Sequence, residues 1–139
     1  MNVKKNLREL KLPSEEEIFK IFSKSYNILN NLPNVAEIEP PITIVGNING
    51  QFKNLLNIFK IGADIPDANY LFLGDYVHRG SYGVETFLYL LILKIKYPDR
   101  ITLLRGSNDM SGIVKINGFL DECEKKFKRI KTPIRRRNF

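Results

Sequence analysis

Apolar residues recur along the first half of the chain first at helical spacing and then in short continuous runs. Ser14, followed three residues later by Glu17, forms a capping-box pattern in front of an apolar series, which predicts a helix over about 14–30. A proline-rich stretch follows, and residues 42–45 (ITIV) are then almost wholly apolar and β-branched. Such a run predicts a buried strand of a parallel sheet.

The same strand–loop–helix unit is repeated further along the chain. The remaining predicted elements are a helix over 51–61, a strand over 70–73, a helix over 84–97, a strand over 101–104 and a short helix over 119–127. Three such units in succession predict an α/β fold with parallel strands and right-handed crossovers. Each strand ends in a polar loop containing glycine, and sites in open α/β sheets lie outside the carboxyl ends of the strands. Candidate chemistry is therefore expected in those loops.

Composition and charge limit the function classes. The 139 residues are enough for one domain with a real core, and no apolar run approaches the roughly 20 residues that span a bilayer. The net charge of +7 is concentrated in residues 125–139, which hold eight Lys and Arg and leave 14 basic and 15 acidic residues elsewhere. We therefore expect a partial domain over 1–127, a disordered basic tail over 128–139, and no nucleic-acid binding except through that tail. A nuclear-localisation role for the tail stays open.

The single cysteine, Cys123, excludes an internal disulfide and fits a reducing compartment, so we expect a cytoplasmic or nuclear protein. We interpret Cys123 as a small core residue. Core positions are also predicted in the helix over 84–97, namely Phe87, Leu88, Leu90, Leu91 and Leu93.

The three loops read GNINGQ (46–51), GDYVHRG (74–80) and RGSND (105–109). The first loop has neither the G-x-G-x-x-G spacing of dinucleotide sites nor the Gly-Lys-Ser/Thr of a P-loop, which excludes both nucleotide motifs. Together with the flanking segments NYLFLGDYV and LLILKIKYPDRITLLRG, the sequence over about 34–127 resembles the metal-dependent serine/threonine phosphoprotein phosphatases, in particular their type 2A, 4 and 6 catalytic subunits.

The resemblance implies a fold and an activity. The fold is the amino-terminal half of the calcineurin-like metallophosphoesterase domain, whose complete form is a central β-sandwich flanked by helices and about twice this length. The activity is hydrolysis of a phosphomonoester by water that bridges two divalent metal ions (Mn, Fe or Zn), since metal binding lowers the pKa of water to roughly 7.

The resemblance also assigns roles to the loop positions, and most are substituted. The family's first loop is Gly-Asp-x-His-Gly with two metal ligands, which here are Asn47 and Asn49. Its third loop is Gly-Asn-His-Glu, with a metal ligand and the general acid, which here are Ser107 and Asn108. Asparagine keeps one neutral carbonyl oxygen, which is a weak ligand for a hard dication, and it donates no proton at neutral pH.

The second loop matches the family pattern more closely than the other two loops do. Its family pattern is Gly-Asp-x-x-Asp-Arg-Gly, and the metal-bridging aspartate is present as Asp75 and the phosphate-binding arginine as Arg79. The second aspartate, which supports the catalytic histidine, is His78. Further family ligands are histidines of the second half, which is not in this sequence. Asp75 alone carries too little charge to hold two dications, so no cofactor is expected to bind tightly.

Each position has a plainer interpretation. Asp75 could simply close a turn, Arg79 could pair with a surface acid, and His78 could be a neutral substitution or a new base. Asn47 and Asn49 could be turn residues or weak residual ligands.

Three functions stay open. The first is a catalytically impaired pseudophosphatase that binds phosphatase regulatory subunits or phosphoproteins, the latter through Arg79, with apolar surface left open for a partner. The second is an active phosphatase completed by another chain. The third is a truncated gene product with no function.

Overall fold

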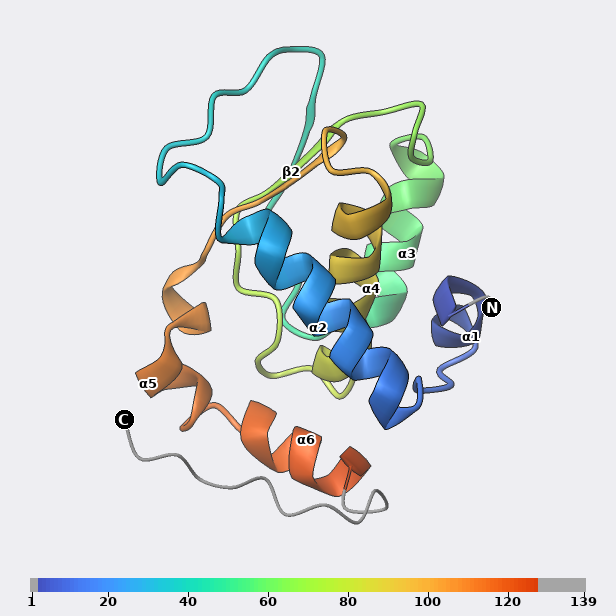
Figure 1. The fold of residues 1–139 in the computed structure, drawn as a ribbon, viewed down its shortest axis with the longest axis vertical. Helices are drawn as coiled ribbons and strands as arrows, with labels where there is room; N and C mark the ends of the chain where they lie inside the picture. The colour runs from blue at the N-terminus through green and yellow to red at the C-terminus, as the bar shows by residue number, and fades with distance from the viewer. Residues whose placement is uncertain (1–2, 128–139) are drawn as a thin grey trace.

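A computed structural model of the chain describes residues 3–127. Its centre is a sheet of three parallel strands (Figure 1), namely β1 (Thr43–Val45), β2 (Tyr70–Phe72) and β3 (Ile101–Leu103). Their order in the sheet is β1-β2-β3. The register pairs Ile44 with Leu71 and Leu71 with Thr102. The predicted α/β class and the parallel pairing are both confirmed. The expected tail over 128–139 lies outside the described residues.

The described helices are α1 (Val3–Arg8), α2 (Glu15–Leu29), α3 (Phe52–Ile61), α4 (Gly83–Lys96), a 3₁₀ turn η1 (Ser107–Asp109), α5 (Ser111–Val114) and α6 (Phe119–Phe127). The predicted helices are present within one residue at each end. The capping box of α2 is also confirmed, because the Ser14 hydroxyl accepts from the Glu17 amide and the Glu17 carboxylate accepts from the Ser14 amide. Among residues 3–127, no helix has the length and apolar character needed to cross a membrane.

Helix α1 was not predicted from the sequence. It is short and basic, and only Leu7 of its residues is buried. Its position depends on distant partners, because the Arg8 Nε donates to the Tyr89 hydroxyl of α4 at 3.0 Å. The helix therefore depends on contacts with distant residues, which the local sequence pattern does not predict.

Helices α3 and α4 pack on one face of the sheet. Since the strands follow one another in space as they do in the chain, two right-handed crossovers place both connecting helices on the same side. The core there is aromatic, with the ring of Phe59 at 5.0 Å from Tyr70 and 6.2 Å from Tyr89. Helix α4 contacts α1, α2, α3, α6 and β3, and the core positions predicted in it are buried except Phe87, which is partly buried.

The other face of the sheet is less covered than predicted. The first strand was expected to be buried, but the side chain of Ile44 is 63% exposed, and Leu73 just after β2 is 45% exposed. The prediction of a fully buried strand is wrong at Ile44, because both crossover helices lie on the opposite face. The expectation of open apolar surface agrees with these exposures.

Helix α6 is held against the start of α4 by charged groups. The Glu122 carboxylate accepts from the backbone amides of Gly83 and Val84, both at 3.1 Å. Lys126 donates to Glu122 and to Glu85, whose side chain is buried in α4. A carboxylate at a helix N-terminus is stabilised by the free amides and the helix dipole. Cys123, predicted to be core, is only partly buried in this contact.

Candidate functional site

The loops that follow β1 and β2 run side by side and are joined through their backbones. The amides of Ile48 and Asn49 donate to the carbonyl of Asp75, at 3.2 and 2.9 Å, and Gly50 donates to Tyr76 at 2.7 Å. Parallel neighbouring strands end at the same edge of a sheet, so their loops meet there. The structure therefore brings together the predicted residues of the first two loops.

The third loop packs directly on the second, and glycine is required at the contact. A Cβ atom on Gly74, whose φ is +111°, would lie 2.0 Å from the amide nitrogen of Gly106. A Cβ atom on Gly106 would in turn lie 2.2 Å from a carboxylate oxygen of Asp75. Only glycine permits this approach. The two glycines thus bring the third loop within hydrogen-bonding distance of Asp75.

Asp75 is the centre of the loop cluster. Its side chain is only 5% exposed, and its backbone adopts a φ of +56°. Oδ2 accepts from the side-chain amides of Asn47 at 3.1 Å and Asn108 at 2.8 Å, and Oδ1 accepts from the Asn108 backbone amide at 2.9 Å. Both carboxylate oxygens are therefore occupied by donors from the neighbouring loops.

Burial and hydrogen bonding act in opposite directions on Asp75. Burial by itself raises the pKa of this carboxyl group, because it penalises the charged form. The two hydrogen bonds from Asn108, together with the nearby His78, outweigh burial and lower the pKa of Asp75 below its usual value. The hydrogen-bond donors thus favour the carboxylate form.

A second carboxylate, Asp109, supports the cluster and was not predicted as a site residue. Its Oδ2 accepts from the backbone amides of Asp75 at 2.6 Å and Gly106 at 2.9 Å, and its Oδ1 accepts from Tyr76 at 3.0 Å. Asp109 stands three positions after Gly106, which precedes the helical turn η1, and an acidic residue at this position commonly caps a helix start. This spacing was the sequence signal that could have identified Asp109. Asp109 therefore joins the second and third loops.

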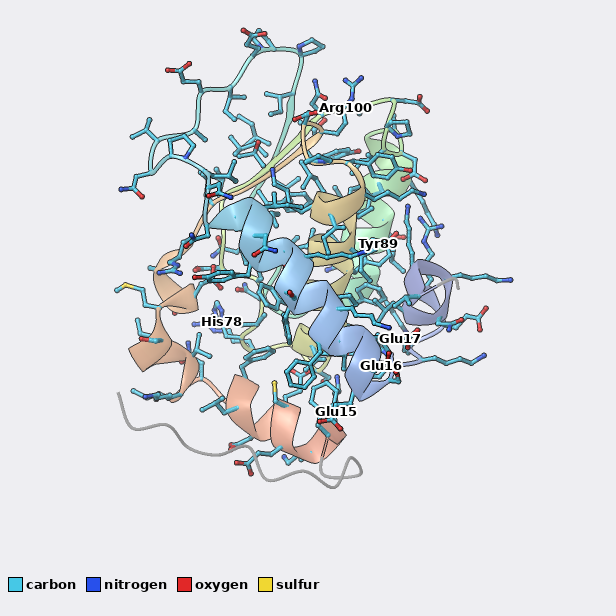
Figure 2. All side chains as sticks on the ribbon, viewed as in Figure 1. Glu15, Glu16, Glu17, His78, Tyr89 and Arg100 are labelled. Atoms are coloured by element: carbon cyan, nitrogen blue, oxygen red, sulfur yellow. The ribbon has the colours of Figure 1, made fainter. Side chains whose placement is uncertain are left out.

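The remaining predicted residues differ in their accessibility. His78 is buried, and its Nδ1 has no hydrogen-bond partner. In the view of Figure 2, His78 lies on one side of α2 and Tyr89 of the aromatic core lies on the other. Arg79 follows with an exposed side chain and a φ of +68°. Asn49 has a buried Oδ1 without a partner, and Ser107 is exposed at the start of η1. Of the predicted set, only Asn47 and Asn108 contact the Asp75 side chain by hydrogen bonds.

These residues do not fit a binuclear metal centre. Within residues 3–127, no three His, Cys, Asp or Glu side chains converge as metal ligands would. The side chains of Asn47 and Asn108 present amide N–H groups, rather than oxygen lone pairs, to Asp75. A dication requires oxygen or imidazole lone pairs directed at it, and several anionic groups to balance its charge. The arrangement instead suits a structural role, in which amide dipoles neutralise one carboxylate.

Comparison with known proteins agrees with this fold. The sequence pattern that defines the calcineurin-like phosphoesterases matches residues 40–139. The structure is similar to that of a serine/threonine phosphatase from Saccharomyces cerevisiae, itself described as similar to human phosphatase PP5, with a TM-score of 0.81 and 32% identity. The match covers 86% of this chain and 40% of that phosphatase, so the chain spans about 40% of its relative's length. The chain therefore belongs to the calcineurin-like phosphoesterase family.

Proposed function

We propose that this chain is a serine/threonine phosphatase relative of the type 2A, 4 and 6 group that does not hydrolyse phosphoesters and acts by binding proteins. The observation that carries the proposal is the occupancy of Asp75. Both of its carboxylate oxygens accept hydrogen bonds from Asn47 and Asn108. A metal ion at this carboxylate would have to displace those donors without gaining an anionic ligand.

The substitutions for the family's proton-transfer groups support the same conclusion. A general acid must reach the leaving group and release a proton near neutral pH. Asn108, at the family's histidine position, has no such proton, and its amide group faces Asp75. His78, at the family's supporting aspartate position, is buried. Losing a general acid costs about 10²–10⁴-fold in rate.

Protein binding requires accessible recognition groups, and Arg79 is one. Arg79 is an exposed residue of the loop after β2, at the position that binds phosphate in the family. Arginine matches the geometry of a phosphate with two parallel hydrogen bonds. Phosphoproteins and phosphatase regulatory subunits are the proposed partners, in the cytoplasm or nucleus.

A calorimetric titration of the full chain with Mn²⁺ tests the central claim. We expect no saturable binding, and no turnover of a phosphoserine peptide in the presence of Mn²⁺. Two equivalents of bound Mn²⁺, with turnover that disappears in Asp75→Asn, would contradict the proposal. The same result would favour the rival function, a phosphatase completed by another chain. The retained Asp75 and Arg79 support that rival function.

Fluorescence anisotropy tests the binding role. A phosphoserine peptide should bind more tightly than its unphosphorylated form, and Arg79→Gln should remove that difference. Arg100→Gln, at an exposed arginine beyond the far end of the sheet, serves as the matched control. Equal loss in both variants would show that only net charge matters.

A further inference from the structure

The sheet has a free edge at β3. Within the described residues the sheet ends at this strand, and its ladder to β2 uses alternate residues, with Tyr70 donating to Arg100 and Leu104 donating to Phe72, both at 2.9 Å. Successive residues of a strand point their backbone groups to opposite edges. The N–H and C=O of Leu103 therefore face away from β2, toward the free edge.

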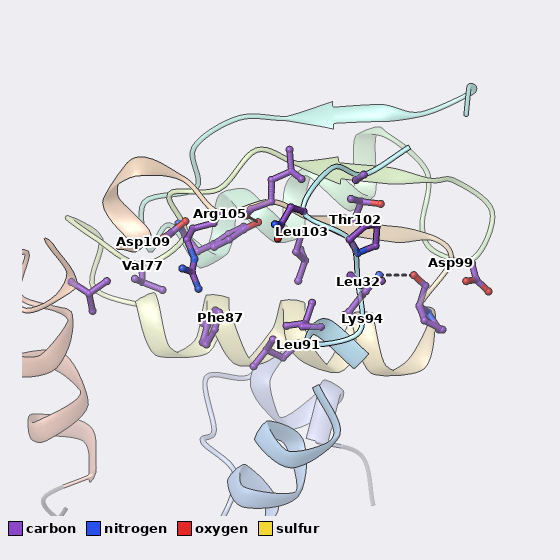
Figure 3. Close-up of a pocket in the computed structure, with 18 of the residues that line it drawn as sticks. Leu32, Val77, Phe87, Leu91, Lys94, Asp99, Thr102, Leu103, Arg105 and Asp109 are labelled. Carbon is purple, nitrogen blue, oxygen red and sulfur yellow. Dashed lines mark hydrogen bonds between the residues drawn. The ribbon is translucent and has the colours of Figure 1, made fainter. Parts of the chain in front are cut away.

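A cavity of about 810 Å³ lies along this edge. Phe87 and Leu91 of α4 line it on one side, and Leu32, from the segment after α2, lines it as well (Figure 3). Residues 102–105 of β3 and the loop after it form the opposite wall. No residue of β1 lines the cavity, so the two outer strands of the sheet differ in this respect.

Lys94 limits where the edge is available. Its ammonium group is buried and donates to the carbonyls of Pro98 at 2.7 Å and Ile101 at 2.8 Å, the first of which is drawn in Figure 3. The outward carbonyl of Ile101 is therefore already satisfied. The open part of the edge begins at Leu103, beside Phe87 and Leu91 of the cavity.

We propose that the β3 edge and this cavity form an acceptor site for an extended peptide segment of another protein. The segment pairs with the backbone of Leu103 as an added strand, and its alternate side chains, which are apolar, enter the cavity above Phe87 and Leu91. Strand addition of this kind takes affinity from backbone hydrogen bonds and specificity from pockets for alternate side chains. The inference rests on the proposed protein-binding function and names a surface for it.

A second copy of the chain fits this site less well. The strand is only three residues long, so symmetric pairing of β3 with its copy would join a very short edge. Stable interfaces bury about 1,200–2,000 Å² in total, which needs more than such an edge. An extended peptide can both pair with the edge and fill the cavity.

The test begins with random nine-residue peptides displayed on phage and panned against the full 139-residue chain. An enriched peptide should slow hydrogen exchange at the Leu103 amide. Leu32→Glu, at a cavity-lining residue that is 46% exposed, should weaken binding roughly tenfold or more, because it places a charge among the apolar side chains of the cavity. Val35→Glu is the matched control, since Val35 lies in the same loop, is 78% exposed and does not line the cavity. Neither position is in the core, so both variants should fold.

Backbone pairing is tested separately from side-chain packing. Two sets of peptides are compared, one methylated at the odd-numbered backbone nitrogens and the other at the even-numbered ones. Only the set whose methylated nitrogens face β3 should lose binding, and the other set should bind normally. Leu103→Pro removes the outward N–H, which an edge strand tolerates, and should weaken binding more than Leu103→Ala.

Three results would overturn the inference: no peptide is enriched, the enriched peptides bind Leu32→Glu as tightly as the native chain, or both sets of methylated peptides bind as tightly as the unmethylated peptide. A concentration-dependent dimer that Leu32→Glu dissociates would assign the edge to a second copy and likewise overturn it. Failure of the proposed function would look different. If the chain bound Mn²⁺ and hydrolysed the phosphopeptide, the proposal that it is non-catalytic would be wrong. The binding of the enriched peptides at the β3 edge would be unchanged by that result.

Discussion

Two regions of the molecule keep a carboxylate away from water, and they neutralise it by different means. In the loop cluster, Asp75 is surrounded by amide donors from Asn47 and Asn108. At the contact between α4 and α6, the buried Glu85 instead meets the ammonium group of Lys126. The first arrangement disperses the charge over neutral dipoles, whereas the second pairs it with one opposite charge.

The difference shows what each region depends on. The donors to Asp75 come from the first and third loops, which the sheet itself brings to the loop that carries Asp75, so the cluster needs only the central fold. Glu85 depends on a residue 41 positions later, at the end of the last described helix. Losing α6 would leave a buried charge unpaired, which costs far more than losing one dipole.

The largest expected effect is on the reaction rate of the Cys123 thiol, which tests the contact between α6 and α4. Burial, with the nearby Glu122, raises the pKa of its thiol to about 11. The thiolate is the reactive form, so at pH 8 the folded chain should react with a thiol reagent roughly two hundredfold more slowly than the unfolded chain, whose cysteine has a pKa of about 8.5. The rate should rise with pH up to about 11. A rate that levels off near pH 9 would show that α6 does not shield the thiol.

Lys126→Met should cause the largest loss of stability. It leaves Glu85 buried without its cation, and we expect a loss of about 2–4 kcal/mol in the free energy of unfolding, somewhat below the value for fully buried pairs because the ammonium is partly exposed. Urea denaturation measures the loss, and the labelling rate of Cys123 should rise. Lys125→Met, an exposed neighbour on the same helix, should change neither quantity. Equal stability of the two variants would contradict the role of the pair.

Asp75→Asn should have a smaller effect. It keeps the volume but replaces a charged acceptor of three hydrogen bonds, which should cost roughly 2 kcal/mol. The exposed Asp67→Asn is the control in the same urea experiment. A cost larger than that of Lys126→Met would reverse the comparison between the two regions.

Asn47→Ala should have the smallest effect. The residue is exposed and contributes one hydrogen bond at 3.1 Å, so we expect a loss of about 0.5 kcal/mol. Asn108→Ala removes a shorter and less exposed bond and should cost about 1 kcal/mol, while its backbone bond remains. If Mn²⁺ stabilised Asn47→Ala but not the native chain, the amide would be shown to block a residual cation site.

Local patterns predicted the elements with strong internal signals. The capping box of Ser14 located the start of α2, and three apolar strand runs located the sheet. The loop residues around Asp75 were placed at one edge of the sheet by topology alone, since parallel strands deliver their loops to the same end. The role of Asp109 and the presence of α1 were not predicted, because each depends on partners far away in the chain.

The sequence alone determined which residue types stand at the family's ligand positions, and therefore that asparagine occurs where anions or imidazoles would be needed. Only the tertiary structure decided what those asparagines do. Hydrogen bonds depend on direction and distance, and only the packing of Gly74 against Gly106 brings the Asn108 amide to Asp75 rather than to solvent. The same holds for the open face at Ile44, because burial there depends on which side of the sheet the crossover helices take. Within residues 3–127 it also holds for the edge of β3, because strand order is set by which strands pair in space.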